Sequence, residues 1–370
     1  MVNFGSMKDT KANLDHQTGR YEWVDYDRGI SIILVSFRHT FESLYNSGVR
    51  LYEYPSIEYM NVFLFGFRMP LFFIASGMFL SGSLEKKGLD GYNKSRLKTI
   101  LYPMMMWGLI QLTLQIMLSG QTNVSYKPSD YLSLIFDPRE TGQFWYLNAL
   151  FFVGALYAIL KVKMNISSPK QLLIGQGMYG LVALIRSEGL YLGFIMDILQ
   201  FYLFFAIGDN VSAVLKNKNN FNTYSSPFIL LLLVPLFILI QYNFTAINIA
   251  MKSNYYVEHN MPLFYLMVAI VGCALSMNIS FILAKLKQLK FLTTIGFHSI
   301  HIYCMQIIAM AGTRIILLKY FKMDDVPLLT SLILIAGILL PILAYKILIR
   351  MNAWWLFTLQ KPSIPIKQHI

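Results

Sequence analysis

Long apolar runs separated by short polar breaks dominate this sequence. A bilayer core about 30 Å thick needs about 20 apolar residues in a spanning helix. Ten runs are candidates, the fifth of them short, at 26–45, 58–82, 97–118, 143–160, 171–185, 190–208, 227–250, 261–284, 291–318 and 326–349. We therefore expect an all-α polytopic membrane protein, a bundle of about ten transmembrane helices.

The distribution of charge gives this bundle an orientation. Only 14% of the residues are charged, yet the net charge is +12, whereas soluble domains carry about 25% charged residues. With a cytoplasmic N-terminus, 19 Lys and Arg fall on the cytoplasmic side and 7 on the other, as expected for cytoplasmic loops. We expect both termini in the cytoplasm, with tails at 1–25 and 351–370 around a membrane domain at 26–350. The basic charge thus indicates a bilayer and gives no reason to expect nucleic acid as a partner.

The first apolar run carries a polar stripe. Arg28 and His39 are eleven positions apart, which returns to nearly the same helix face at about 100° per residue, and Glu42 lies close to that face. Charged groups at bilayer depth are costly and are functional candidates by default. An arginine at the cytoplasmic mouth suits a phosphate, and a histidine near the midplane can take a proton from a hydroxyl. A carboxylate such as Glu42 can orient the imidazole. A packing role for His39 between helices is the alternative.

Polar residues on other segments are further candidates. Arg68, near mid-depth in the second run, is expected to meet His39 or Glu42, either in a site or in a structural ion pair with Glu42. Ser76 and Gly77 offer a small surface of the kind that membrane helices use at contacts. The basic cluster Lys94, Arg96 and Lys98 either sets orientation only or holds the phosphates of a nucleotide.

Asp197 is expected at mid-depth in the sixth run. His298 and His301 share a side of the ninth run, but no carboxylate or thiolate is spaced to complete a metal site, so we expect none. Cys273 and Cys304 lie inside apolar runs and predict neither a disulfide framework nor a metal site.

These residues together resemble the integral-membrane acyltransferase family 3, over about residues 25–345. The family's first helix carries an arginine and, after ten residues, a histidine, as Arg28 and His39 do here. The other matching motifs are Phe72-Phe73-Ile74-Ala75-Ser76-Gly77, Lys94 to Lys98 followed by Pro103, Phe144-Trp145-Tyr146-Leu147, and Ile295-Gly296 with Ser299 and Ile302-Tyr303. Gln306 stands near the place where many members have a histidine.

The resemblance implies an acyl-CoA-dependent O-acyltransferase, usually an O-acetyltransferase, in a bacterial cytoplasmic (inner) membrane. Its acceptor would be a hydroxyl of a cell-surface or exported polysaccharide, or of a lipid-linked glycan, and polysaccharide biosynthesis or export machinery is an expected partner. Acetyl-CoA would be a co-substrate, with no permanently bound cofactor. His39 would act as a base or as a covalent acyl carrier. The CoA phosphates would be held by Arg28, Lys94, Arg96 and Lys98, and the site would be lined by Arg68, Phe73, Ser76, Gly77, Trp145 and Asp197.

Two other functions compete with this one. A transporter of a polar solute or glycan would use Arg68, Glu42 and Asp197 to line a pathway, but transporters often show inverted repeats, and the sequence has no such symmetry. A channel-forming or structural membrane protein is least consistent with the stripe on the first helix.

Overall fold

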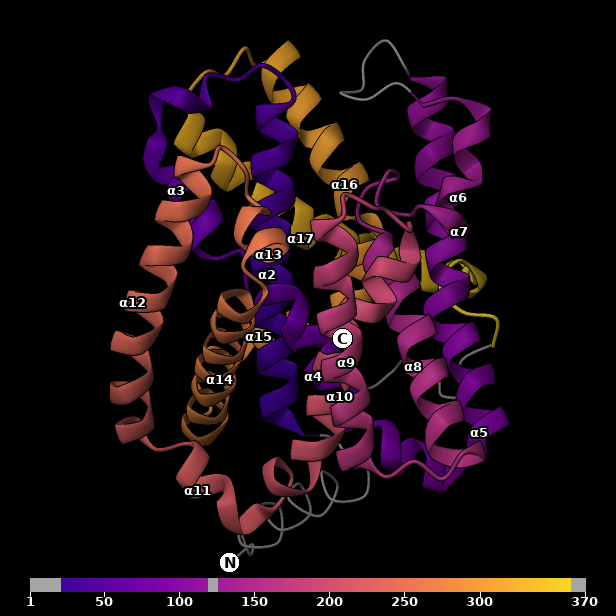
Figure 1. The fold of residues 1–370 in the computed structure, drawn as a ribbon. Coiled ribbons are helices and arrows are strands. Elements are labelled where there is room, and N and C mark those ends of the chain that lie inside the picture. Colours follow the sequence, from indigo (N-terminus) through magenta and orange to yellow (C-terminus); the bar gives the residue numbers. More distant parts are fainter. Residues whose placement is uncertain (1–20, 119–125, 361–370) are drawn as a thin grey trace, which may run out of the picture.

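The computed structural model describes residues 21–118 and 126–360. This part of the chain is a bundle of helices and contains no strand (Figure 1). The helices are α2 (Glu22–Tyr45), α3 (Pro55–Phe63), α4 (Arg68–Met78), α5 (Leu80–Arg96), α6 (Tyr102–Met117), α7 (Ser133–Phe136), α8 (Trp145–Lys163), α9 (Ser168–Ser187), α10 (Phe194–Leu215), α11 (Phe221–Tyr224), α12 (Pro227–Ala250), α13 (Tyr256–Asn260), α14 (Pro262–Leu286), α15 (Phe291–Phe297), α16 (Ser299–Ile315) and α17 (Val326–Arg350). Most of the expected tails, 1–20 and 361–370, lies outside the described residues.

Local sequence signals explain where several helices begin. Proline occupies the first turn of α6, α9, α12, α14 and α17, where its missing N–H has no partner to lose. Asp325 caps α17 by accepting a hydrogen bond from the Leu328 N–H at 2.8 Å. Ser226 caps α12 in the same way. The starts of these long helices therefore follow from the sequence.

The number of helices fit to cross a membrane differs from the expected ten. Among the described residues, eight helical segments are long and apolar enough, and they coincide with eight of the ten expected runs. The other two runs form α2 and α9, of 24 and 20 residues. Both are of spanning length, but α2 carries charged residues along its length and α9 is rich in glycine and glutamine.

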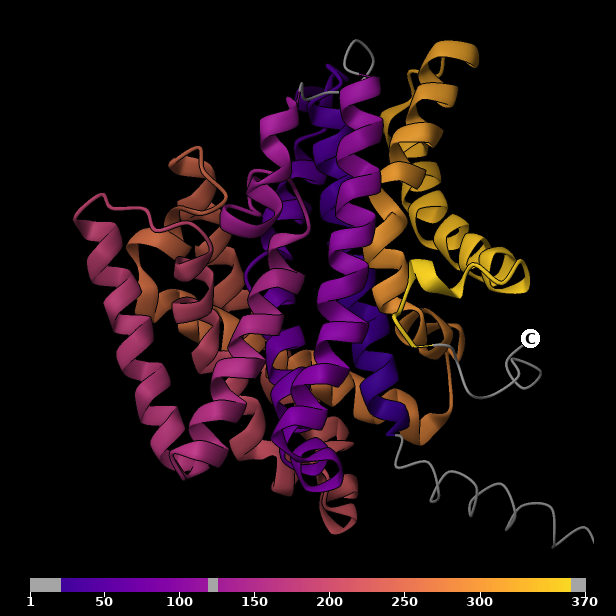
Figure 2. The same cartoon turned by 90° about the vertical axis from the view of Figure 1, so that its right-hand side faces the viewer.

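The charges of α2 are compatible with a membrane because protein surrounds this helix. It packs against α4, α14, α15, α16 and α17, and Figure 1 shows it in the middle of the bundle with α12 and α14 on one side and α5, α6 and α8 on the other. In Figure 2, α17, in yellow, lies at one side and leans away from α2. We call the end of the bundle where α2 begins the inner end and the opposite end the outer end.

Two expected single spans are broken. The second consists of α3 and α4, separated by residues 64–67, so that Arg68 is the first residue of α4. The ninth is interrupted at His298, between α15 and α16. The expected inner loop 83–96 is helical and belongs to α5, in which Gly88, with a φ of 66°, joins two helical stretches.

The inner half of α2 is held tightly by α15 and α14. A Cβ atom added at Gly29 would clash with the backbone carbonyl of Leu292, and one added at Gly296 with that of Asp25. Glycine therefore allows the two backbones to touch, as in other membrane helix pairs. The buried Asp27 carboxylate accepts hydrogen bonds from Ser276 and Ser280 of α14 at 2.8 and 3.4 Å.

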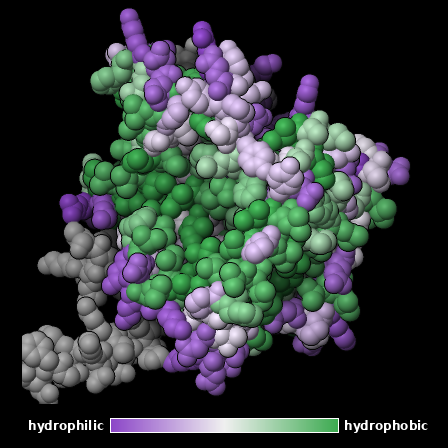
Figure 3. All heavy atoms as spheres, turned by 90° about the vertical axis from the view of Figure 1, so that its left-hand side faces the viewer, coloured by the Kyte–Doolittle hydropathy of each residue, from purple (hydrophilic) through white to green (hydrophobic). Residues whose placement is uncertain are grey.

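The surface of the bundle suits a lipid environment. On the face that α12 covers, Figure 3 shows an apolar belt with hydrophilic residues gathered above and below it. Large apolar side chains of α12 are exposed there, among them Phe228, Leu231, Leu232, Leu236, Ile238 and Leu239. A contiguous exposed apolar surface of this kind marks contact with a membrane or with another protein.

Candidate active site

A cavity of about 760 Å³ lies between the helices. Most of its lining comes from α2, α4, α6, α13 and α16 and from the segment 139–145 that leads into α8, and Phe65, Phe201 of α10 and Tyr265 of α14 also contribute. Asn46, Leu118 and Arg314, at the outer ends of α2, α6 and α16, are part of it. The cavity therefore reaches towards the outer end of the bundle.

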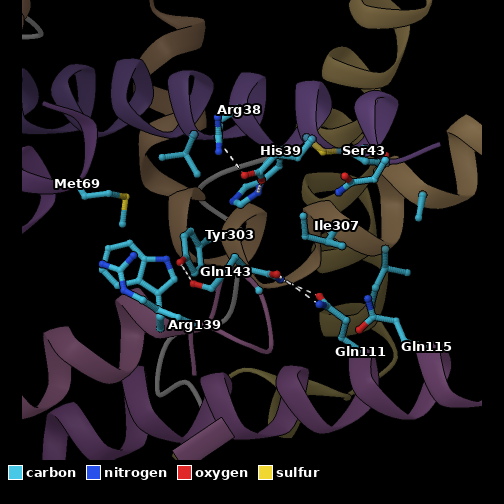
Figure 4. A pocket seen from close by; sticks show the side chains of 18 of the residues that line it. Arg38, His39, Ser43, Met69, Gln111, Gln115, Arg139, Gln143, Tyr303 and Ile307 are labelled. Atoms are coloured by element: carbon cyan, nitrogen blue, oxygen red, sulfur yellow. Dashed lines mark hydrogen bonds and ion pairs between the residues drawn. The ribbon is translucent and has the colours of Figure 1, made fainter. Parts of the chain in front are cut away.

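A carboxylate holds two basic side chains of α2 inside this cavity. His39 Nδ1 lies 2.9 Å from Glu42 Oε2, and Arg38 Nε lies 2.7 Å from Glu42 Oε1. Figure 4 shows Arg38 and His39 directed from α2 into the cavity. With Glu42 ionised, Nδ1 carries the proton and donates it, so Nε2 keeps a lone pair and can act as a base.

The structure brings Arg68 into the same cavity as His39 and Glu42, but the arginine that forms an ion pair with Glu42 is Arg38 of its own helix. Arg68 is buried, lines the cavity and donates from Nη1 to the Leu34 carbonyl at 2.9 Å, while Arg38 makes the ion pair with Glu42. Arg38 is not among the residues expected from the sequence, although its i, i+4 spacing to Glu42 is a signal for such a pair.

The wall of the cavity opposite α2 is polar and aromatic. The Tyr303 hydroxyl donates to the Gln143 carbonyl, and the side-chain amides of Gln143 and Gln111 pair at 2.8 Å (Figure 4). Trp145 lines the cavity as expected, with the Arg139 guanidinium 4.1 Å from its ring centroid.

Asp197 has a different place from the expected one. It lies in the first turn of α10, not at mid-depth, and is not part of the cavity lining. Its buried carboxylate pairs with Arg139 at 2.6 Å, which ties the segment before α8 to the bundle. Asp197 thus holds Arg139 in place, and Arg139 packs against Trp145 in the cavity lining.

The α13 segment forms another part of the lining through Glu258 and His259. The Gln200 side chain donates to Glu258 at 2.8 Å and accepts from Arg186 at 2.5 Å. Burial lowers the pKa of His259, and the Glu258 carboxylate only partly opposes this shift. His259 is therefore neutral over most of the physiological pH range.

Arg28, Phe73 and Ser76 lie on the inner side of the cavity and do not line it. They surround Tyr146: Phe73 packs 5.4 Å from its ring, and Arg28 and Ser76 lie near its hydroxyl. On its other side, the Tyr146 ring packs 5.3 Å from Tyr303. Tyr146 thus has Arg28 near its hydroxyl and contacts Tyr303, a residue that lines the cavity.

Two further expected site residues have packing roles. Arg96 donates to the Leu150 carbonyl at 2.6 Å and fills the space beside Gly154, which joins α5 to α8. Gly77 lets α4 approach the Phe205 backbone of α10. Lys94 is exposed and Lys98 is half-exposed.

A buried cluster at the inner end was not anticipated. The Asp209 carboxylate accepts hydrogen bonds from Ser81, Tyr157, Lys161 and Ser168 at 2.5–2.9 Å. These donors lie on α5, α8 and α9, so one carboxylate of α10 joins four helices.

His298 and His301 lie away from the cavity. The His301 ring is 3.8 Å from that of Tyr345 and 5.3 Å from that of Phe357. Within the described ranges, no group of three or more His, Cys, Asp or Glu is arranged to hold a metal ion. The pair packs with aromatic side chains.

Apolar helices around a cavity that holds a paired histidine and carboxylate define an integral, multi-pass membrane protein with an enzyme-like site. Residues 21–346 match the family model of the acyltransferase 3 domain, so the chain belongs to acyltransferase family 3 and is a membrane acyltransferase. No curated protein and no solved structure matches it.

Proposed function

We propose that the protein transfers an acyl group, acetyl in the simplest case, from cytoplasmic acyl-CoA to a hydroxyl of a cell-surface or exported glycan in a bacterial cytoplasmic membrane. The observation that carries this proposal is the pairing of His39 with Glu42 in a cavity that reaches towards the outer end. That cavity can admit an acceptor from one side while the donor comes from the other.

His39 is the central group of the reaction. Its Nε2 takes the proton of the acceptor hydroxyl, whose oxygen attacks the thioester carbonyl. The C–S bond breaks, and the CoA thiolate takes the proton from His39. In the other route, Nε2 attacks the thioester, the C–S bond breaks and CoA leaves as the thiolate. The acceptor hydroxyl then attacks the acyl carbon, the N–C bond to Nε2 breaks, and the hydroxyl proton passes to the CoA thiolate. In both routes Glu42 fixes the imidazole and stabilises its positive charge.

The donor is expected at the inner side of Tyr146. Arg28 lies there, half-buried, with its guanidinium 5.9 Å from the Phe79 ring. Arg28 and the inner-end cations Lys94 and Lys98 suit the CoA phosphates, whereas the Arg96 guanidinium is engaged by the Leu150 carbonyl. Because Tyr146 has Arg28 near its hydroxyl and Tyr303 against its ring, we expect its side chain to move for the acyl group to reach His39.

The acceptor is expected in the cavity itself. Trp145, Tyr255 and Tyr265 present aromatic rings there, and Gln111 and Gln143 present amides. Rings that pack on sugar faces and amides that bond sugar hydroxyls are chemically suited to a glycan.

The test compares envelope glycans from a deletion strain complemented with wild type, His39→Gln or Arg28→Gln. Mass spectrometry before and after mild alkali measures the ester-bound acyl group. We expect the acyl mass only with wild type, with all proteins present in the membrane at equal amounts. Full acylation with His39→Gln would contradict the mechanism.

A transporter is the second candidate. The breaks between α3 and α4 and between α15 and α16 favour it, because transporters bind substrates at interrupted helices. Glycan export that continues without any acyl donor, with unchanged glycan masses, would support transport.

A further inference from the structure

The charge of the cavity lining is unbalanced. The charged residues that line it, apart from histidine, are four arginines and two glutamates: Arg38, Arg68, Arg139, Arg314, Glu42 and Glu258. Arg139 is neutralised from behind by Asp197. The positive excess therefore lies on the side of the cavity that α2, α4 and α16 form.

Two of these arginines lie against one aromatic ring. The guanidinium carbons of Arg38 and Arg68 are 5.4 and 4.8 Å from the centroid of Phe65. They are close enough to repel each other, and Glu42 is the carboxylate near both. Like charges this close, away from bulk water, are unfavourable unless an anion joins them.

Arg38 also has an unused donor. Its Nε is bound to Glu42, but its Nη1 is buried and has no hydrogen-bond partner in the described part of the chain. A buried donor without a partner destabilises the protein. A ligand oxygen at this point would remove that cost.

We infer that the acceptor carries an acid group, a carboxylate or a phosphate, which Arg38 and Arg68 bind beside His39. This inference rests on the proposed function, in which a sugar hydroxyl is acylated. It adds that the sugar carrying this hydroxyl, or its neighbour, is acidic. Guanidinium groups bind planar carboxylates and phosphates through paired hydrogen bonds. Because Arg38 and His39 contact the two oxygens of one carboxylate, Glu42, the acid group and the acylated hydroxyl lie on the same or adjacent sugar units.

The acid group belongs to the acceptor and not to the donor because of its position. Arg38 and Arg68 line the cavity that extends to the outer end, whereas Arg28 does not line it and lies near the Tyr146 hydroxyl. The phosphates of an acyl-CoA at Arg28 are thus remote from the Arg38–Arg68 pair.

The first arm of the test measures binding without catalysis. Purified protein is melted with glucuronate, glucose 6-phosphate or the neutral methyl ester of glucuronic acid, at one ionic strength. We expect an acid sugar to raise the melting temperature of wild type and the ester to leave it unchanged. Comparing the melting shift with glucuronate to that with glucose 6-phosphate shows whether the site prefers a carboxylate or a phosphate. Equal effects of acid and ester, or none, would overturn the inference.

The second arm measures selectivity in transfer. The ratio of kcat/KM for a uronate oligosaccharide to that for its methyl-esterified form is compared between wild type and Arg38→Gln. We expect the ratio to fall about tenfold or more, which corresponds to about 1.4 kcal/mol. A purely structural or transition-state role for Arg38 would lower both values equally and leave the ratio unchanged, which would overturn the inference.

Arg50→Gln is the matched control, because it removes one positive charge from an exposed arginine outside the cavity. We expect Arg50→Gln to show the same melting shifts with acid sugars, and the same selectivity for them in acyl transfer, as the wild-type protein. Loss of selectivity in this variant would overturn the inference in favour of a general charge effect. The protein could bind acid sugars in an Arg38-dependent way and yet transfer no acyl group to any sugar. This result would support the anion site and contradict the proposed function.

Discussion

Replacing Glu42 by Gln tests the core of the site with the least change in shape. Glu42 accepts from His39 Nδ1 at 2.9 Å and from Arg38 Nε at 2.7 Å. The amide has one acceptor oxygen and an NH₂ group, so it can serve one of these donors and must face the other with a donor of its own. The variant therefore loses both the charge and the orientation that Glu42 gives to His39.

The size of the effect follows from these two contacts. Hydrogen bonds to charged groups contribute about 1.5–3 kcal/mol each, so a reaction that depends on both contacts loses about 3–6 kcal/mol, or about 10²- to 10⁴-fold in rate. Because 36% of the Glu42 side chain is exposed, solvent screens part of the interaction. The lower end, about 10²-fold, is the better expectation.

The assay uses membranes with labelled acyl-CoA and measures label in the glycan fraction, with each protein quantified. Glu53→Gln is the control, because Glu53 forms an exposed pair with Arg50 at 3.6 Å outside the cavity, and we expect it to retain the wild-type rate. A Glu42→Gln protein that is folded and within threefold of wild type would refute the orienting role of Glu42.

Three further changes probe the bundle around the site. Gly296→Ala places a methyl group against the Asp25 carbonyl and should destabilise the fold by about 1–3 kcal/mol or more, seen as a lower melting temperature. Asp209→Asn leaves the Lys161 ammonium without its carboxylate and should cost about 3–5 kcal/mol, with His39-dependent chemistry retained in whatever protein folds. Tyr146→Ala should open the way between the donor side and the cavity and raise acyl-CoA hydrolysis by water; unchanged hydrolysis would exclude Tyr146 as the barrier.

The polar stripe of α2 could be predicted because it depends on local geometry. The helical repeat alone brings His39 and Glu42 to one side, and the structure places both in one cavity. The repeat also puts Arg28 about 16 Å away along the helix, and the structure finds it outside the cavity. The repeat of α2 does not reveal Tyr146, a residue of α8 whose hydroxyl lies near Arg28 and whose ring packs against Tyr303.

Contacts between distant residues could not be predicted in this way. The partner of Asp197 is 58 positions away in the chain, and Asp209 gathers donors from three other helices. The helix breaks at 64–67 and at His298 lie inside apolar runs that a hydropathy pattern reads as continuous. These contacts and helix breaks depend on how the helices pack against one another. Local sequence patterns do not contain that information.

The contact between α2 and α15 has a consequence for how the protein works. Where two backbones touch through Gly29 and Gly296, one helix cannot slide or turn against the other without a steric collision. His39 is thus mounted on a stationary helix, and substrates must be admitted by movement elsewhere. A movement of the segment before α8 would have to break the contacts of Arg139 with Asp197 and of Gln143 with Gln111 that fasten it to the bundle.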